Sequence, residues 1–156
     1  MKLTLSSTVM ADRAQVFAAL VDPAILQRCI PGCESLTSTG DDAYAATLKV
    51  GVAGMKGTYT GKAAITNKQP PDSMTLSFDG KGGPGFVRGS AALAFSADGA
   101  DGKGTRVACD ADVQVGGLIA AVGSRLVEAA ARKLADDFFR QLARELEAAR
   151  TPSGAR

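Results

Sequence analysis

The segment that most constrains the fold is residues 118–149, which has the pattern of one long amphipathic helix. Apolar side chains recur there at helical spacing, and the principal stripe comprises Leu126, Ala130, Leu134, Phe138, Leu142 and Leu146. A helix with a single apolar stripe has to bury that stripe against another layer of structure. The rest of the chain must therefore supply a surface long enough to cover it.

Strand patterns fill most of the remaining sequence. Residues 2–9 alternate apolar and polar side chains, and six further alternating segments lie between positions 33 and 115. Turn residues separate them, for example Gly40-Asp41-Asp42, and we expect the glycine-rich segment 80–85 to form a flexible loop. Consecutive strands without intervening helices predict an antiparallel sheet with one solvated face.

Two short helices are predicted between the first strand and the others. Asp12 is typical of a helix N-cap, and Asp22-Pro23 combines a capping side chain with a proline suited to the first turn. The order is therefore strand, two helices, six strands and a long helix. This order predicts an α+β fold of the helix-grip type, in which a curved seven-stranded antiparallel sheet surrounds the last helix. We expect one domain over residues 1–149 and a flexible tail at 150–156.

The inward positions of the predicted sheet are often small, as at Gly61, Ala63, Ala91 and Ala111. Small side chains leave space unless the backbone closes over them, so we expect a cavity that is either packed or holds an apolar ligand. Phe86 would dip into it from the glycine-rich loop, which could act as a lid at its mouth. The residues expected to line the cavity are Ile30, Tyr44, Tyr59, Phe78, Phe86, Leu118, Val122 and Leu126.

Catalytic and metal-binding patterns are scarce. The chain has no histidine, so the usual base at neutral pH is missing. Its thiols, Cys29, Cys33 and Cys109, are too few for a cysteine zinc site, and the segment between the first two predicts a Pro-Gly turn. We expect neither a metal site nor a catalytic residue. Tyr44 and Tyr59 leave two alternatives open: core packing, or hydrogen bonds to a ligand carbonyl.

Charge and hydropathy exclude other classes of protein. The net charge is +2, and no basic stripe with interleaved aromatic residues is present, which argues against nucleic-acid binding. No signal peptide and no apolar run of about 20 residues is found, and an odd number of cysteines suits a reducing compartment. We therefore expect a cytoplasmic location.

Seven segments together resemble the CoxG-like family, named for the G subunit of carbon monoxide dehydrogenase, within the START-like, or polyketide-cyclase-like (SRPBCC), superfamily. The resemblance covers residues 1–148, and its segments are Leu20-Val21-Asp22-Pro23, Cys29-Ile30-Pro31-Gly32-Cys33-Glu34, Lys49-Val50-Gly51, Tyr59-Thr60-Gly61, Gly104-Thr105, Val115-Gly116-Gly117-Leu118-Ile119 and Lys133-Leu134-Ala135-Asp136-Asp137-Phe138-Phe139. It implies the helix-grip fold and an accessory role beside a molybdenum-containing dehydrogenase of the carbon monoxide dehydrogenase type.

The resemblance further implies that the protein recruits this dehydrogenase to the inner face of the cytoplasmic membrane and handles a quinone, its lipophilic electron acceptor. Some members carry a C-terminal extension for membrane contact, whereas only residues 151–156 follow the helix here, which favours transient contact over a stable anchor. The first hypothesis is thus a non-catalytic carrier without an intrinsic cofactor that binds a quinone or another lipid. The alternatives are a small-molecule cyclase or dehydratase of the same superfamily, and a ligand-free adaptor that recruits the dehydrogenase.

Overall fold

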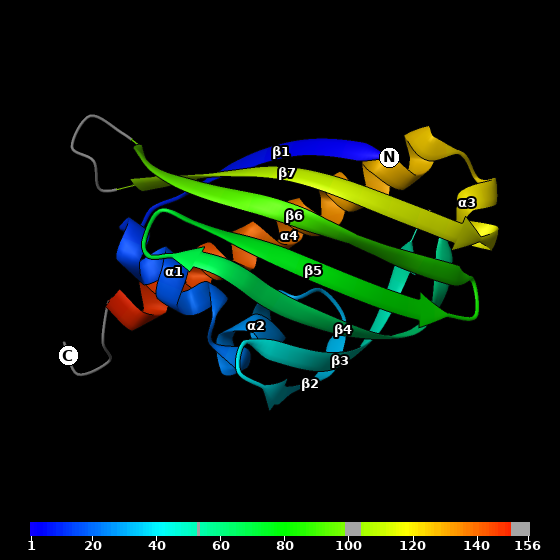
Figure 1. Ribbon diagram of the computed structural model, residues 1–156, viewed down its shortest axis with the longest axis horizontal. Helices are drawn as coiled ribbons and strands as arrows, with labels where there is room; N and C mark the ends of the chain where they lie inside the picture. Colours follow the sequence, from blue (N-terminus) through cyan, green and yellow to red (C-terminus); the bar gives the residue numbers. More distant parts are fainter. Residues whose placement is uncertain (53, 99–103, 151–156) are drawn as a thin grey trace.

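A seven-stranded sheet curves over one long helix in the computed structural model, which describes residues 1–52, 54–98 and 104–150 (Figure 1). The predicted order of elements is confirmed, apart from a break near the start of the last helix. In chain order the elements are β1 (Lys2–Val9), α1 (Arg13–Leu20), α2 (Pro23–Cys29), β2 (Cys33–Gly40), β3 (Ala43–Val52), β4 (Met55–Gln69), β5 (Ser73–Gly82), β6 (Gly85–Asp98), β7 (Gly104–Gly117), α3 (Leu118–Ala121) and α4 (Ser124–Arg150). Most of the predicted tail, residues 151–156, lies outside the described residues.

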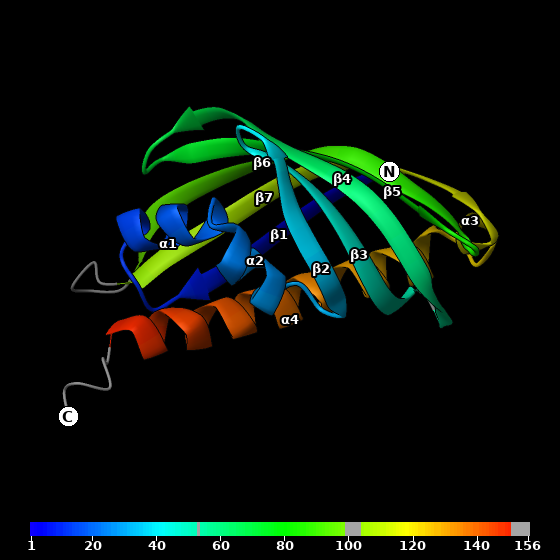
Figure 2. The same cartoon turned by 90° about the horizontal axis from the view of Figure 1, so that it is seen from below.

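The sheet is antiparallel throughout, with the strand order β1-β7-β6-β5-β4-β3-β2. Strands β2 to β7 form a meander, and β1 pairs with β7, so that β1 and β2 are the two edges of the sheet. Figure 2 shows α4 lying along the concave side, while α1 and α2 sit at the end of the sheet where α4 finishes. The concave face is therefore the only sheet face that a helix of the described chain covers.

The predicted single helix over 118–149 is wrong at its start. The structure has a short α3 and a separate α4, with Gly123 between them at φ +97°. Glycine adopts this left-handed conformation without the steric cost that a Cβ atom imposes, so the chain changes direction there. The backbone N–H of Ile119 donates to the carbonyl oxygen of Pro84 at 3.1 Å, which ties α3 to the β5–β6 turn.

The glycine-rich segment is a tight hairpin rather than the predicted loop. Strand β5 continues to Gly82 and β6 resumes at Gly85, so only Gly83 and Pro84 form the turn. A Cβ atom on Gly85 would lie 2.1 Å from the carbonyl oxygen of Gly116, and Gly85 has φ +146°. This glycine permits close strand pairing. The segment therefore offers no support for a lid.

The N-cap of α1 is as predicted. The carboxylate of Asp12 accepts from the backbone N–H of Gln15 at 2.8 Å, and the Gln15 side chain accepts from the backbone N–H of Asp12 at 3.2 Å. This reciprocal pair is a capping box. We expect Asp12→Ala to lower the free energy of unfolding by about 1 kcal/mol in urea denaturation, because the first of these bonds needs the carboxylate. Asp12→Asn, which also caps, is the control; an equal loss in both variants would contradict this role.

Candidate functional site

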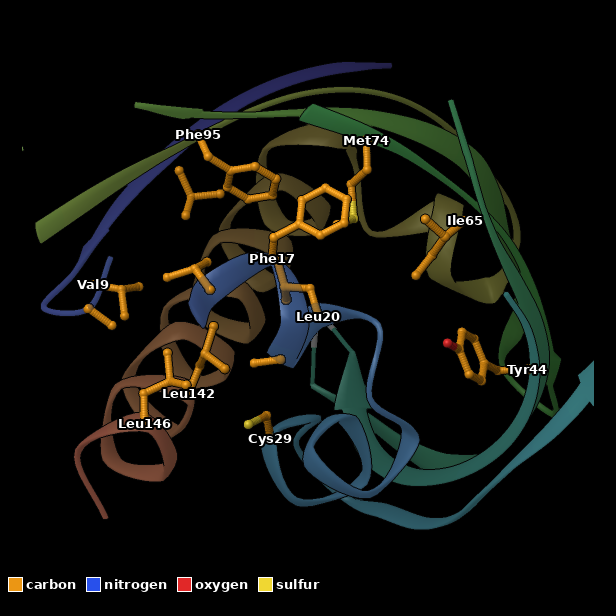
Figure 3. Close-up of a cluster of buried hydrophobic side chains, with 14 residues drawn as sticks. Val9, Phe17, Leu20, Cys29, Tyr44, Ile65, Met74, Phe95, Leu142 and Leu146 are labelled. Atoms are coloured by element: carbon orange, nitrogen blue, oxygen red, sulfur yellow. The ribbon is translucent and has the colours of Figure 1, made fainter. Parts of the chain in front are cut away.

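Two separate apolar clusters lie between the sheet and the helices. The first cluster lies where α1 and α2 pack on the C-terminal half of α4, with Phe17 and Phe95 in edge-to-face contact at 5.9 Å (Figure 3). The second cluster lies at the other end of the sheet and is built on Tyr59, Ile119 and Val127. The concave face between the two clusters is therefore the part of the interior to inspect for a binding site.

A continuous band of small residues crosses that part of the concave face. Cross-strand pairing places Gly61 beside Ala46 and Gly80. It also places Ala63 and Gly89 on either side of Phe78. We define the small-residue band as Ala46, Gly61, Ala63, Gly80, Gly89, Ala91 and Ala111. Of the residues that the structure describes, none in this band belongs to either cluster, and all except Ala91 are only half-buried.

The part of α4 that faces the small-residue band also carries half-buried apolar side chains. Ala130, Ala131 and Leu134 are half-buried and also lie outside both clusters, within the described residues. Small and half-buried apolar residues thus face each other on the two layers between two well-packed ends. This surface, the small-residue band together with Phe78 and the facing turns of α4, is the candidate site. Ala46, Gly80 and Gly89 were not singled out from the sequence, because only strand register shows that they adjoin the predicted small residues.

The two tyrosines both reach protein acceptors. The Tyr44 hydroxyl donates to the carbonyl oxygen of Val21 at 3.1 Å, and the Tyr59 hydroxyl donates to that of Met55 at 3.4 Å. Figure 3 shows the Tyr44 ring projecting from β3 into the interior. Burial raises the pKa of both phenols, so both stay protonated at neutral pH. Of the two alternatives, this geometry favours core packing with satisfied hydroxyls.

The other predicted lining residues are dispersed. Phe78 lies within the band, Val122 packs on the second cluster, and Ile30 is half-buried at the end of α2. Leu118 and Leu126 are 63% and 54% exposed, at the start of α3 and in the first turn of α4. The structure therefore does not gather the eight residues around one point, and their contact with a ligand stays a prediction.

Phe86 lies on the outer face of the sheet, contrary to the expectation that it dips inward. Its ring centroid is 4.5 Å from the guanidinium carbon of Arg88, a cation–π contact. A Cβ atom on Gly116 would lie 2.1 Å from this ring, so the ring covers the backbone of β7. The neighbouring Val87 packs on the second cluster, as alternation along a strand requires.

Two pockets lie on the β1 side of the sheet; they adjoin the band, since Val113 of the larger one pairs with Gly89, but no band residue lines them. A small one of about 100 Å³ lies between β1, β7 and α4, beside Cys109 and Phe139. A larger one of about 470 Å³ opens at the end of β7, beside Val115, Ser124 and Val127. Apart from Phe86, which borders the larger pocket, neither is lined by a predicted site residue.

The ionisable groups of the interior are poorly suited to acid–base work. Burial raises the pKa of the Cys29 thiol to about 11, and it also raises the pKa of Cys33 and Cys109. A thiolate is the nucleophilic form, so these thiols are weak nucleophiles at neutral pH. No three His, Cys, Asp or Glu side chains lie together as a metal site in the described part of the chain.

Thiol reactivity provides a check on this arrangement. We expect iodoacetamide to modify Cys29 most slowly of the three cysteines in the folded protein, because its thiol is both buried and protonated. Raising the pH toward 11 should increase its rate, since the thiolate fraction grows as the pH approaches the pKa. Peptide mass spectrometry over a time course measures this order. In urea the three rates should converge; rapid labelling of Cys29 at pH 7 in the folded protein would contradict its burial.

Comparisons with known proteins identify a family and support the fold described above. The sequence profile of the CoxG family, described as the G subunit of carbon monoxide dehydrogenase, matches residues 6–147. A conserved protein from Geobacillus kaustophilus is 32% identical, with 97% of each chain covered and a TM-score of 0.89. No curated protein shows significant similarity.

More distant structures share the fold alone. A START superfamily protein from Mycobacterium smegmatis is 12% identical, with a TM-score of 0.69 over 94% of this chain and 97% of that one. A Thermus thermophilus protein is 15% identical, with a TM-score of 0.69 over 96% and 99%. These similarities confirm the predicted helix-grip fold. Within the described residues, no helix is long and apolar enough to cross a bilayer.

Proposed function

Because this chain belongs to the CoxG family of carbon monoxide dehydrogenase, we propose that it serves a molybdenum-containing dehydrogenase as a non-catalytic accessory protein. In this role it binds an apolar ligand between the sheet and α4 and carries it between the enzyme and the membrane. The proposal places the protein in the cytoplasm, with transient contact at the inner face of the membrane.

The small-residue band is the observation that carries the proposal. Protein interiors are close-packed, so apolar surface left half-buried between two packed clusters favours a further apolar occupant. Burying about 300 Å² of such an occupant would contribute about 7 kcal/mol before the cost of association is subtracted. Micromolar affinity requires about 8 kcal/mol after that cost, so the occupant has to bury more than this area. A tail of several isoprenoid units is large enough to do so.

The chemistry around the band favours a lipid with few polar groups. In the described chain no buried side-chain nitrogen or oxygen lacks a hydrogen-bond partner, so no buried polar group there awaits a ligand. A quinone with an isoprenoid tail fits this environment and is the electron acceptor that the family resemblance implies. The raised pKa values of the thiols and phenols argue against the cyclase or dehydratase alternative, because such chemistry needs a group that exchanges protons near neutral pH.

Lipid analysis tests the proposal directly. Protein purified without detergent from a quinone-producing host should release quinone or another isoprenoid lipid on organic extraction, as detected by mass spectrometry. Protein stripped of lipid should bind a short-chain naphthoquinone at micromolar concentration, as measured by the quenching of tyrosine fluorescence. Protein that neither retains lipid nor binds added quinones would refute the carrier role.

A further inference from the structure

Three segments meet at one end of the molecule, and we call this the hairpin end. They are the β3–β4 hairpin, the β5–β6 turn and the connection from β7 through α3 to α4 (Figure 2). Pro84 joins them, because its carbonyl oxygen accepts from Ile119 and its ring lies directly over Gly57 of β4. The hairpin end is therefore one continuous surface.

This end is almost free of carboxylates. The sequence contains no Asp or Glu within residues 43–71, 80–97 and 113–127. Five basic residues of these segments lie near the hairpin end, which are Lys49, Lys56, Lys81, Arg88 and Arg125, whereas Lys68 pairs with Asp42 at the other end of β4. The carboxylates that border these segments are Glu34, 3.5 Å from the Lys49 ammonium, and Glu128, which pairs with Arg132. Two more are Asp112, 3.9 Å from the N-terminal ammonium, and Asp79, which lies in register with Lys62 and Arg88. Lys56, Lys81 and Arg125 have no ion-pair partner among the described residues, so the hairpin end keeps a positive charge.

The opposite end of the molecule carries charges of both signs, because Arg13 pairs with Asp72 and Lys68 pairs with Asp42. It carries the N-caps of α1 and α2 and the turns before β3 and β5, which hold Asp12, Asp22, Asp41, Asp42 and Asp72. The chain as a whole has a net charge of only +2. The unpaired basic residues of the hairpin end therefore form a local positive patch, which favours contact with an anionic surface.

Large apolar side chains also protrude at the hairpin end. Leu118 and Leu126 are two of the three exposed large apolar residues of the described chain, and the exposed Arg125 lies beside Leu126 in sequence. Exposed leucines flanked by basic residues are typical of surfaces that enter the headgroup region of a bilayer. An acidic protein partner would account for the basic residues but not for isolated leucines at the protruding end.

We propose that the hairpin end docks on an anionic lipid bilayer. Leu118 and Leu126 enter the headgroup region, while Lys56 and Arg125 lie against lipid phosphates. This inference rests on the proposed carrier function. Docking at this end would turn the second cluster and the end of the small-residue band toward the membrane, which would supply the ligand. It assigns membrane contact to a surface of the folded domain rather than to the C-terminal tail.

Vesicle flotation of the full chain tests the docking surface. The protein should float with phosphatidylcholine vesicles that contain phosphatidylglycerol, but not with phosphatidylcholine alone, and added salt should release it. The variant Lys56→Glu/Arg125→Glu should lower partitioning at least about tenfold, because each basic side chain at an anionic membrane contributes about fivefold. Leu118→Ser should lower it as well while leaving the salt dependence unchanged.

The matched control is Arg106→Glu/Arg144→Glu, which makes the same change in net charge at exposed positions on the opposite side of the fold. It should float like the unmodified chain. Equal losses in the two double variants, or full binding by Lys56→Glu/Arg125→Glu, would overturn the assignment. Retention of the chain on a purified dehydrogenase through Lys56 and Arg125, without any flotation, would also overturn it and would indicate a protein partner.

Ligand binding separates this inference from the proposed function. Lys56→Glu/Arg125→Glu should bind the short-chain naphthoquinone as the unmodified chain does, since neither residue belongs to the small-residue band. Normal vesicle docking by a chain that binds no quinone would refute the carrier function and leave the docking surface standing. Normal quinone binding without docking would refute only the docking surface.

Discussion

Ala63→Phe is expected to weaken quinone binding by at least about tenfold while the protein keeps its thermal stability. Ala63 lies in the middle of the small-residue band, where it pairs with Tyr44 on one side and Phe78 on the other. A phenyl ring there would occupy the space that the proposed function assigns to the ligand, so an open band would accommodate the ring without strain. Titration with a short-chain naphthoquinone and a thermal melt measure the two quantities.

The next residue along β4 supplies the control. Ala64 projects from the opposite face of the sheet, so Ala64→Phe adds the same ring without entering the interior. It should bind quinone normally. If the interior were instead packed, Ala63→Phe would overfill it at a cost of about 1–3 kcal/mol and would lower the melting temperature. Unchanged quinone affinity in Ala63→Phe would show that the ligand does not lie on the band.

Leu142→Ala is expected to have the largest effect on stability. Leu142 is fully buried in the first cluster, so its truncation removes apolar contacts and leaves a cavity. The loss should be about 3 kcal/mol in the free energy of unfolding, which corresponds to a fall of about 6–12 °C in melting temperature for a chain of this size. Urea denaturation with an unchanged slope would measure it.

Leu126→Ala is the matched control on the same helix. Its side chain is mostly exposed, so the same truncation should cost less than about 1 kcal/mol. Equal losses in the two variants would contradict the observed rotation of α4 about its axis.

The contrast between these leucines also shows where helical periodicity misleads. Each i+4 step advances about 40° beyond a full turn of an α-helix, so a stripe drawn by such steps drifts around the helix. Leu126 and Leu142 are four steps apart and are therefore rotated by about 160° relative to each other. The sequence pattern correctly predicts the amphipathic helix but places Leu126 on the buried side, whereas the structure leaves it exposed.

The sequence predicts that small residues face the interior, but it does not predict every strand that contributes them. Alternation along β4 and β6 is sufficient to predict that Gly61, Ala63 and Ala91 face inward. The sequence assigns Gly80 to a loop and begins the next strand after Gly89, whereas the structure extends β5 to Gly82 and begins β6 at Gly85, so the contribution of these two glycines to the band is not predicted. Phe86 was misplaced because the glycines around it indicated a mobile loop, while the backbone uses them for close pairing of β6 with β7.

The sequence by itself determined the class of fold, the order of the elements and the family, because local alternation, helix caps and short motifs are properties of neighbouring residues. Tertiary structure alone decided that the long terminal segment breaks at Gly123, that the core divides into two clusters and that small residues from five strands form one band between them. It also decided that three carboxylate-free segments meet at one end. These features depend on strand register and on the rotation of α4, which arise only when segments distant in the chain pack together.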